Sequence, residues 1–149
     1  LFAAACEGAV MLSGESDGIL ARMHSVGLNL GIAFQLIDDV LDYEGDPETT
    51  GKNVGDDLNE GKPTLPLIHA MNHASPEGAA LIADSIRQKS VENLDAVVAL
   101  AKTTGGIQET RRAAVEHCER VSTALAGLPA TAARTSLEKL AEFSIARES

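Results

Sequence analysis

Aromatic residues are scarce in this 149-residue sequence, which has no tryptophan, one tyrosine and three phenylalanines. Strands are usually rich in aromatic and β-branched residues, whereas alanine and leucine, which are abundant here, favour helices. No segment shows the alternation of apolar and polar residues that is typical of a half-buried strand. These two absences argue against a β-sheet protein, and we expect an all-α fold.

Basic residues are also few, with 12 Lys and Arg against 22 Asp and Glu and a formal net charge of −10. Surfaces that bind nucleic acid or anionic lipid need clustered Lys and Arg. We therefore expect no nucleic-acid partner and no binding driven by an anionic membrane. An acidic protein of this kind can bind an anionic ligand only through metal cations or a local group of lysines.

The two cysteines, Cys6 and Cys118, lie far apart and form neither a disulfide framework nor a zinc-binding spacing, so we expect buried thiols. No run of 18 apolar residues and no signal peptide is present, which predicts a cytoplasmic protein without a transmembrane segment. The sequence opens without Met on an alanine-rich apolar stretch that is typical of the middle of a helix. We therefore expect it to begin inside a longer protein.

Helical periodicity, capping residues and glycine or proline stops predict about six or seven helices in one packed unit. They cover residues 1–12, 19–43 and 63–72, segments capped by Ser75 and Ser90, a stripe over 107–128 and a last helix through 133–141. Residues 45–62 are polar and glycine-rich, which predicts a loop. Gly27 and Gly31 lie one turn apart in the long second helix and predict a close helix contact.

The segment FQLIDDVLDY, residues 34–43, gathers acidic residues on one face of a helix. Asp38 and Asp42 are four residues apart and therefore neighbours, and Gln35 lies one turn before Asp38 and Asp39. The carboxylates repel one another and also face the negative end of the helix dipole. A bound cation would offset both costs, and oxygen ligands of this kind suit Mg²⁺. A solvated acidic helix end remains the alternative.

The following loop adds cations, because Gly51-Lys52 and Gly61-Lys62 flank the pair Asp56 and Asp57. Lysines on a glycine-rich backbone can bind a diphosphate as point charges. The segment is not a P-loop, since it lacks the four-residue spacer and the Ser or Thr after Lys. Each lysine taken alone is typical of a solvated loop, and only the nearness of the aspartates suggests a shared site.

The two segments together, FQLIDDVLDY and then GKNVGDDLNEGKPTLPLI over residues 51–68, resemble the second aspartate-rich region of trans-isoprenyl (polyprenyl) diphosphate synthases. The order of residues is most similar to that of bacterial long-chain enzymes of the octaprenyl type, and the resemblance extends over the whole chain. It implies the C-terminal half of the all-α isoprenoid synthase bundle. Residues 1–149 would then be part of one domain whose N-terminal half, with the first DDxxD motif, is absent.

The resemblance also implies the metal ligands. Asp38 and Asp39 would hold Mg²⁺ bridging to an allylic diphosphate and would be catalytic. Asp42 would complete the motif, and Asp57, or its neighbour Asp56, would support the metal shell.

Three further residues are implied to bind the diphosphate of the substrate. Lys52 would contact it directly and count as catalytic, Lys62 would add positive charge, and Gln35 would hydrogen-bond near the metal-bound waters. The implied reaction ionises an allylic diphosphate, with farnesyl diphosphate expected, and joins it head to tail to isopentenyl diphosphate. The expected product is an all-trans polyprenyl diphosphate, octaprenyl by similarity, for ubiquinone and other quinone side chains. A homodimer is also implied.

Because a site built from two facing halves cannot work with one, we expect this chain alone to be inactive. Two alternatives from other classes stay open: a non-catalytic subunit that pairs with an active chain, and a metal-binding helical module. A related terpene cyclase is disfavoured, because cyclases usually carry a different second metal motif. His69 and His73, four residues apart, are a conceivable zinc pair, although ordinary surface histidines are the simpler interpretation.

Overall fold

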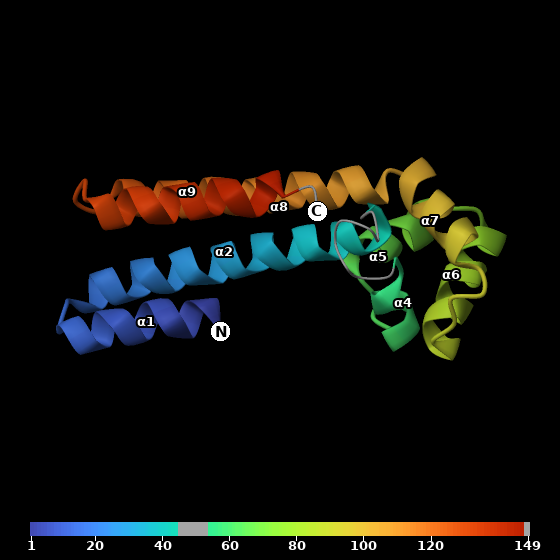
Figure 1. Ribbon diagram of the computed structural model, residues 1–149, viewed down its shortest axis with the longest axis horizontal. Coiled ribbons are helices and arrows are strands. Elements are labelled where there is room, and N and C mark those ends of the chain that lie inside the picture. The colour runs from blue at the N-terminus through green and yellow to red at the C-terminus, as the bar shows by residue number, and fades with distance from the viewer. Residues whose placement is uncertain (45–53, 148–149) are drawn as a thin grey trace. The chain divides into compact units, whose positions relative to one another are not determined.

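The computed structural model describes residues 1–44 and 54–147 (Figure 1). Over these ranges the regular secondary structure is helical throughout, as the sequence predicts. The helices are α1 (Phe2–Ser13), α2 (Asp17–Glu44), α4 (Asp56–Glu60), α5 (Leu65–His73), α6 (Pro76–Gln88), α7 (Leu94–Thr103), α8 (Gly106–Ala126) and α9 (Ala132–Ala146). No helix within the described ranges is long and apolar enough to cross a membrane.

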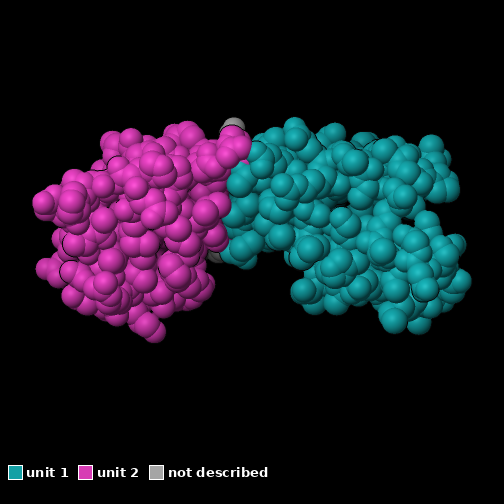
Figure 2. Space-filling view, turned by 180° about the vertical axis from the view of Figure 1, so that it is seen from behind, with its two compact units in different colours: residues 1–37, 113–147 teal, residues 38–112, 148–149 magenta. Residues whose placement is uncertain are grey.

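The chain divides into two compact units, coloured separately in Figure 2. Unit 1 comprises residues 1–37 and 113–147, and the described part of unit 2 comprises residues 38–112. Helices α2 and α8 each contribute residues to both units. The aspartates at the end of α2 therefore belong to unit 2, together with α4 to α7.

Unit 1 is built around apolar side chains from α2, α8 and α9, with α1 lying alongside α2 (Figure 1). The buried members of this core are Val26, Leu30, Ala33, Cys118, Val121, Leu125 and Ala141. Cys118 is buried as predicted, and both cysteines are free thiols. Val115 of α8 and Leu140 of α9, which apolar periodicity would place on the core side, are 41% and 45% exposed. The two helices therefore bury narrower stripes than their sequences indicate.

The close helix contact predicted at Gly27 and Gly31 joins α2 to α1. A Cβ added to Gly27 would lie 2.6 Å from the carbonyl oxygen of Phe2, and one on Gly31 would lie 3.1 Å from the Phe2 Cβ. Both distances are shorter than ordinary van der Waals contact, and the one at Gly27 is to backbone. Glycine at position 27 therefore lets the backbone of α1 approach α2 this closely. The Phe2 ring in turn packs against Phe34, with ring centroids 5.6 Å apart.

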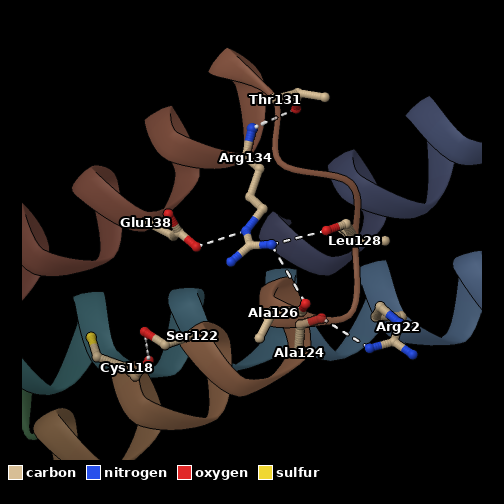
Figure 3. Close-up of polar contacts among 9 residues, drawn as sticks. All are labelled: Arg22, Cys118, Ser122, Ala124, Ala126, Leu128, Thr131, Arg134 and Glu138. Atoms are coloured by element: carbon tan, nitrogen blue, oxygen red, sulfur yellow. Dashed lines mark hydrogen bonds and ion pairs between the residues drawn. The ribbon is translucent and has the colours of Figure 1, made fainter.

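Two arginines complete the C-terminal end of α8 in unit 1 (Figure 3). Arg22 Nη1 donates to the carbonyl of Ala124 over 3.1 Å, and Arg134 Nη1 donates to that of Ala126 over 3.5 Å. Arg134 Nη1 also donates to the carbonyl of Leu128, just beyond the helix, over 2.9 Å. The last carbonyls of a helix lack partners within the helix and carry its negative dipole end. Guanidinium groups satisfy both needs here.

The core of unit 2 joins the end of α2 to the short helices that follow. Its buried apolar residues are Val40, Tyr43, Leu58, Leu67, Ala70, Ile82, Val97, Ala101 and Ile107. Ser75 caps α6 as predicted, accepting a hydrogen bond from the Gly78 N–H over 3.2 Å, with Pro76 in the first helical position. The helices α4 to α7 thus each present one or two buried apolar residues to a common interior.

Three local predictions in unit 2 are wrong. Residues 56–60, predicted as loop, form α4, because buried Leu58 anchors a helical turn there. Helix α7 begins at Leu94 rather than after Ser90, whose hydroxyl oxygen instead accepts a hydrogen bond from the Glu92 N–H. The helix predicted over residues 63–72 begins at Leu65, and the side chain of Thr64 before it does not cap it.

Candidate functional site

The last turns of α2 present Asp38, Asp39 and Asp42 just before the helix ends at Glu44. Asp39 is 8% exposed, and Asp38 and Asp42 are half-buried. Aspartates are rarely buried unless something compensates their charge. The structure therefore gives these three residues the partial desolvation that the apolar flanks predict. Gln35 lies one turn earlier on the same helix, is exposed, and belongs to unit 1.

The segment that includes α4 is fastened to Asp42. The Gly55 N–H donates to the Asp42 carbonyl oxygen over 2.9 Å, and the Asp57 N–H donates to Asp42 Oδ2 over 3.2 Å. These two bonds hold the start of α4 against the end of α2. They bring Asp42 and Asp57, separated by 15 residues in sequence, into one acidic site.

The pKa of the Asp42 carboxyl is raised to about 6. Burial is the largest cause, and the negative charges of Asp57 and Asp56 act in the same direction. The backbone N–H groups of the same two residues favour the carboxylate but do not cancel this effect. Asp42 thus carries a repulsion that a nearby cation would relieve.

Lys62 lies beside the same site, because Gly61 ends α4 in the left-handed conformation and returns the chain. The Lys62 ammonium is 2.9 Å from Asp57 Oδ1 and 2.6 Å from Glu60 Oε2. These two carboxylates raise its pKa, so the side chain stays protonated. Lys62 therefore places a positive charge beside Asp57, where two carboxylates already engage it.

Gly55 positions α4 and was not identified from the sequence as a site residue. It has φ 86°, in the left-handed region, and a Cβ there would lie 2.5 Å from Leu94 Cδ1 of α7. Both constraints favour glycine. Its place directly before Asp56 and Asp57 was the available signal, because glycine is a common N-cap residue and acidic residues are favourable in the first turn of a helix.

Tyr43 also fixes the end of α2 and was likewise missed. Its ring is 1% exposed, and its hydroxyl lies 2.9 Å from the Thr64 Oγ1, just before α5. Burial is the main reason that the pKa of Tyr43 is raised. This hydrogen bond joins the end of α2 to the start of α5. It also explains why the Thr64 hydroxyl does not cap that helix.

The predicted diphosphate ligand Lys52 lies outside the described residues. The four predicted metal ligands Asp38, Asp39, Asp42 and Asp57 are all described, yet no three His, Cys, Asp or Glu side chains in residues 1–44 and 54–147 are placed to hold one ion. The protein thus offers no complete cage there. This arrangement fits Mg²⁺, which commonly takes one or two carboxylates and fills its shell with phosphate oxygens and water.

The histidine pair lies on α5, with the rings of His69 and His73 stacked at a centroid distance of 4.0 Å. His69 Nε2 is 3.2 Å from the Thr104 carbonyl oxygen, and His73 Nδ1 is 2.9 Å from the His69 carbonyl oxygen. One nitrogen of each ring is therefore engaged by the backbone. The zinc interpretation gains no third ligand from the described part of the chain.

Comparison with known proteins shows the protein family to which this chain belongs. The family model named Polyprenyl synthetase matches residues 1–102. The chain is 44% identical over 149 residues to octaprenyl diphosphate synthase from Escherichia coli (strain K12), covering 99% of this chain and 46% of that protein. It is 41% identical to all-trans-nonaprenyl-diphosphate synthase (geranyl-diphosphate specific) from Rhodobacter capsulatus, covering 99% of this chain and 45% of that protein.

A solved structure agrees with these relatives. Polyprenyl synthase from Caulobacter crescentus CB15, complexed with calcium and isoprenyl diphosphate, superposes with a TM-score of 0.88 at 38% identity, covering 99% of this chain and 46% of that one. The predicted all-α isoprenoid synthase fold is thereby confirmed. The chain belongs to the polyprenyl synthetase family. It spans about half the length of the curated relatives that it matches.

Proposed function

We propose that this chain provides the second diphosphate-binding half of a trans-polyprenyl diphosphate synthase. The observation that carries the proposal is the paired Asp42 and Asp57, joined by a backbone hydrogen bond, with a raised pKa at Asp42 and Lys62 beside them. Carboxylates held together at a cost, next to a lysine, suit a ligand that brings both a cation and phosphate oxygens. Family membership supplies the reaction class.

In the proposed reaction the carbon–oxygen bond of an allylic diphosphate breaks, and the diphosphate leaves with the electron pair. The chemistry that Mg²⁺ supplies when bound is neutralisation of the charge that develops on the departing diphosphate. Asp38, Asp39 and Asp42 would hold the cation, with Asp57 in support. Lys52 and Lys62 would contact phosphate oxygens, and Gln35 would orient water near the metal.

The double bond of isopentenyl diphosphate then donates its electrons to the allylic carbon, and loss of a proton from the adjacent carbon restores an alkene. Repetition lengthens an all-trans chain. We further propose farnesyl diphosphate as the primer, an octaprenyl product for quinone biosynthesis, and a cytoplasmic homodimer. The identity of 44% to an octaprenyl diphosphate synthase supports the product length.

The proposed reaction needs the first DDxxD motif, which this chain lacks, to face the aspartates of α2. The chain alone should therefore be inactive. A non-catalytic subunit is the runner-up function. The described acidic residues argue against a non-catalytic subunit. A site that no longer binds its ligand has no physical reason to keep Asp39 buried or the pKa of Asp42 raised. A carboxylate-bridged metal module would need a complete protein cage, which the described residues do not form.

A chimera tests the function directly. This chain is joined to the portion of the E. coli octaprenyl diphosphate synthase that it does not cover, and incubated with Mg²⁺, farnesyl diphosphate and labelled isopentenyl diphosphate. We expect long polyprenyl diphosphates from the chimera, none from the chain alone, and none from a chimera carrying Asp38→Asn. The control Asp84→Asn removes an exposed aspartate of α6 that is paired with Arg87, and should keep activity. Full activity of the Asp38→Asn chimera would refute the site.

A further inference from the structure

Unit 1 contains an open groove between α2 and α8, within residues that the aspartate site does not use. Its volume is about 610 Å³, and Gly18, Ala21 and Ala124 form small-residue walls that leave room for a ligand. None of the described residues that line it is acidic.

Two guanidinium groups line this groove, and neither has a carboxylate partner in the described chain. Arg120 is exposed and makes no hydrogen bond or ion pair with any residue in 1–44 or 54–147. Arg22 uses one N–H for the Ala124 carbonyl, as Figure 3 shows, and its remaining N–H groups are not engaged by another described residue. Arg87, for contrast, is paired with a neighbouring aspartate.

The floor of the groove supplies a hydroxyl donor. Asn29, 8% exposed, donates through Nδ2 to the Ser25 carbonyl over 2.8 Å and to Ser25 Oγ over 3.3 Å. Since Ser25 Oγ accepts that bond, its own O–H remains able to donate. The Thr123 hydroxyl is less useful, because it already donates to the Glu119 carbonyl over 2.9 Å.

His117 does not line the groove but is hydrogen-bonded to Asn29, which does. His117 Nδ1 is 2.8 Å from Asn29 Oδ1, and the pKa of His117 is lowered by burial and then by Arg120, with Glu116 acting in the opposite direction. The contact with His117 holds the Asn29 side chain in place. The groove is therefore lined by the guanidinium groups of Arg22 and Arg120 and by the Ser25 hydroxyl. Asn29, beside them, is held by hydrogen bonds to Ser25 and His117.

We propose that this groove binds a phosphate group. Guanidinium forks match phosphate and carboxylate oxygens in pairs. A phosphate group offers three terminal oxygens, enough for two forks and the Ser25 hydroxyl, whereas a carboxylate offers two. The group is either free phosphate or the phosphate of a small organic ligand. This site is separate from the proposed diphosphate site and needs no Mg²⁺.

Titration calorimetry with inorganic phosphate in the presence of EDTA tests the proposal, because chelation removes any contribution from the metal-dependent aspartate site. Arg120→Gln should weaken binding by about tenfold or more, as expected for loss of charge-assisted hydrogen bonds. Arg120→Lys, which keeps the charge but not the fork, should lie between. Arg87→Gln changes the net charge equally and lies on α6 of unit 2, so it should bind like the wild type.

A parallel titration with glycerol phosphate distinguishes the two sources. Tighter binding than inorganic phosphate identifies an organic phosphate as the ligand, and weaker binding identifies the free ion. Equal affinities of the wild type and Arg120→Gln would overturn the proposal, as would the absence of any binding at millimolar phosphate. Because Arg120 is exposed and makes no hydrogen bond or ion pair with a described residue, loss of binding in its variants would not reflect a lost structural contact.

Discussion

Replacing Asp42 with asparagine should stabilise the ligand-free protein at neutral pH. The pKa of Asp42 is raised from 3.8 to about 6, so the folded state holds this proton more tightly than the unfolded state does. Between these two values the folded state binds more protons, and stability falls as the pH rises. The asparagine carries no charge and can still accept the hydrogen bond from the Asp57 N–H. The variant should therefore escape this loss.

The expected size follows from the shift. A change of about two pKa units corresponds to ~3 kcal/mol, at about 1.4 kcal/mol for each unit. Asp42 is only half-buried, and solvent screening lowers the effect. We expect a gain of about 1–2 kcal/mol at pH above the folded pKa, and almost none below the unfolded pKa.

Urea unfolding followed by circular dichroism measures this gain, across a pH series for the wild type and Asp42→Asn. The difference between the two proteins should grow as the pH rises from about 4 to about 6 and then level off. Asp95→Asn is the control, since Asp95 is exposed in the first turn of α7, where a carboxylate is favourable. An Asp42→Asn protein that is less stable at neutral pH, or whose difference from the wild type does not change with pH, would refute the reasoning.

Three substitutions should destabilise the fold at named contacts. Gly55→Ala places a Cβ against a leucine of α7 at positive φ and should cost about 1–3 kcal/mol in urea unfolding while weakening diphosphate binding; unchanged values for both would contradict its positioning role. Gly27→Ala pushes α1 from α2 and should cost a similar amount, whereas Gly8→Ala, with open space around it, should not. Tyr43→Phe leaves the Thr64 hydroxyl without its partner and should cost about 1 kcal/mol, and a thermal melt identical to the wild type would exclude this.

The helices could be predicted because their signals are local. Apolar periodicity located α2 and α8, and Ser75-Pro76 located the start of α6. Helix α4 could not be predicted, because a five-residue segment with four polar residues forms a helix only when Leu58 is buried by distant segments. The exposure of Leu140 has the same origin, since periodicity gives an apolar face but not the width of the surface that covers it.

The candidate site was predictable in composition but not in geometry. The spacing of Asp38 and Asp42 on one helix follows from the helical repeat. The meeting of Asp42 with Asp57 depends on how the chain returns between them, and no local rule fixes that return. Nor could the sequence indicate that Lys62 would lie between two carboxylates.

Binding of inorganic diphosphate with and without Mg²⁺ is the most direct test of the central claim. The titration is made on this chain and on its Asp38→Asn and Asp84→Asn variants. The account predicts that Mg²⁺ strengthens diphosphate binding to the wild type and to Asp84→Asn, and that Asp38→Asn loses this enhancement. Equal enhancement by Mg²⁺ in all three proteins, or in none, would contradict the assignment of the aspartate helix as a diphosphate site.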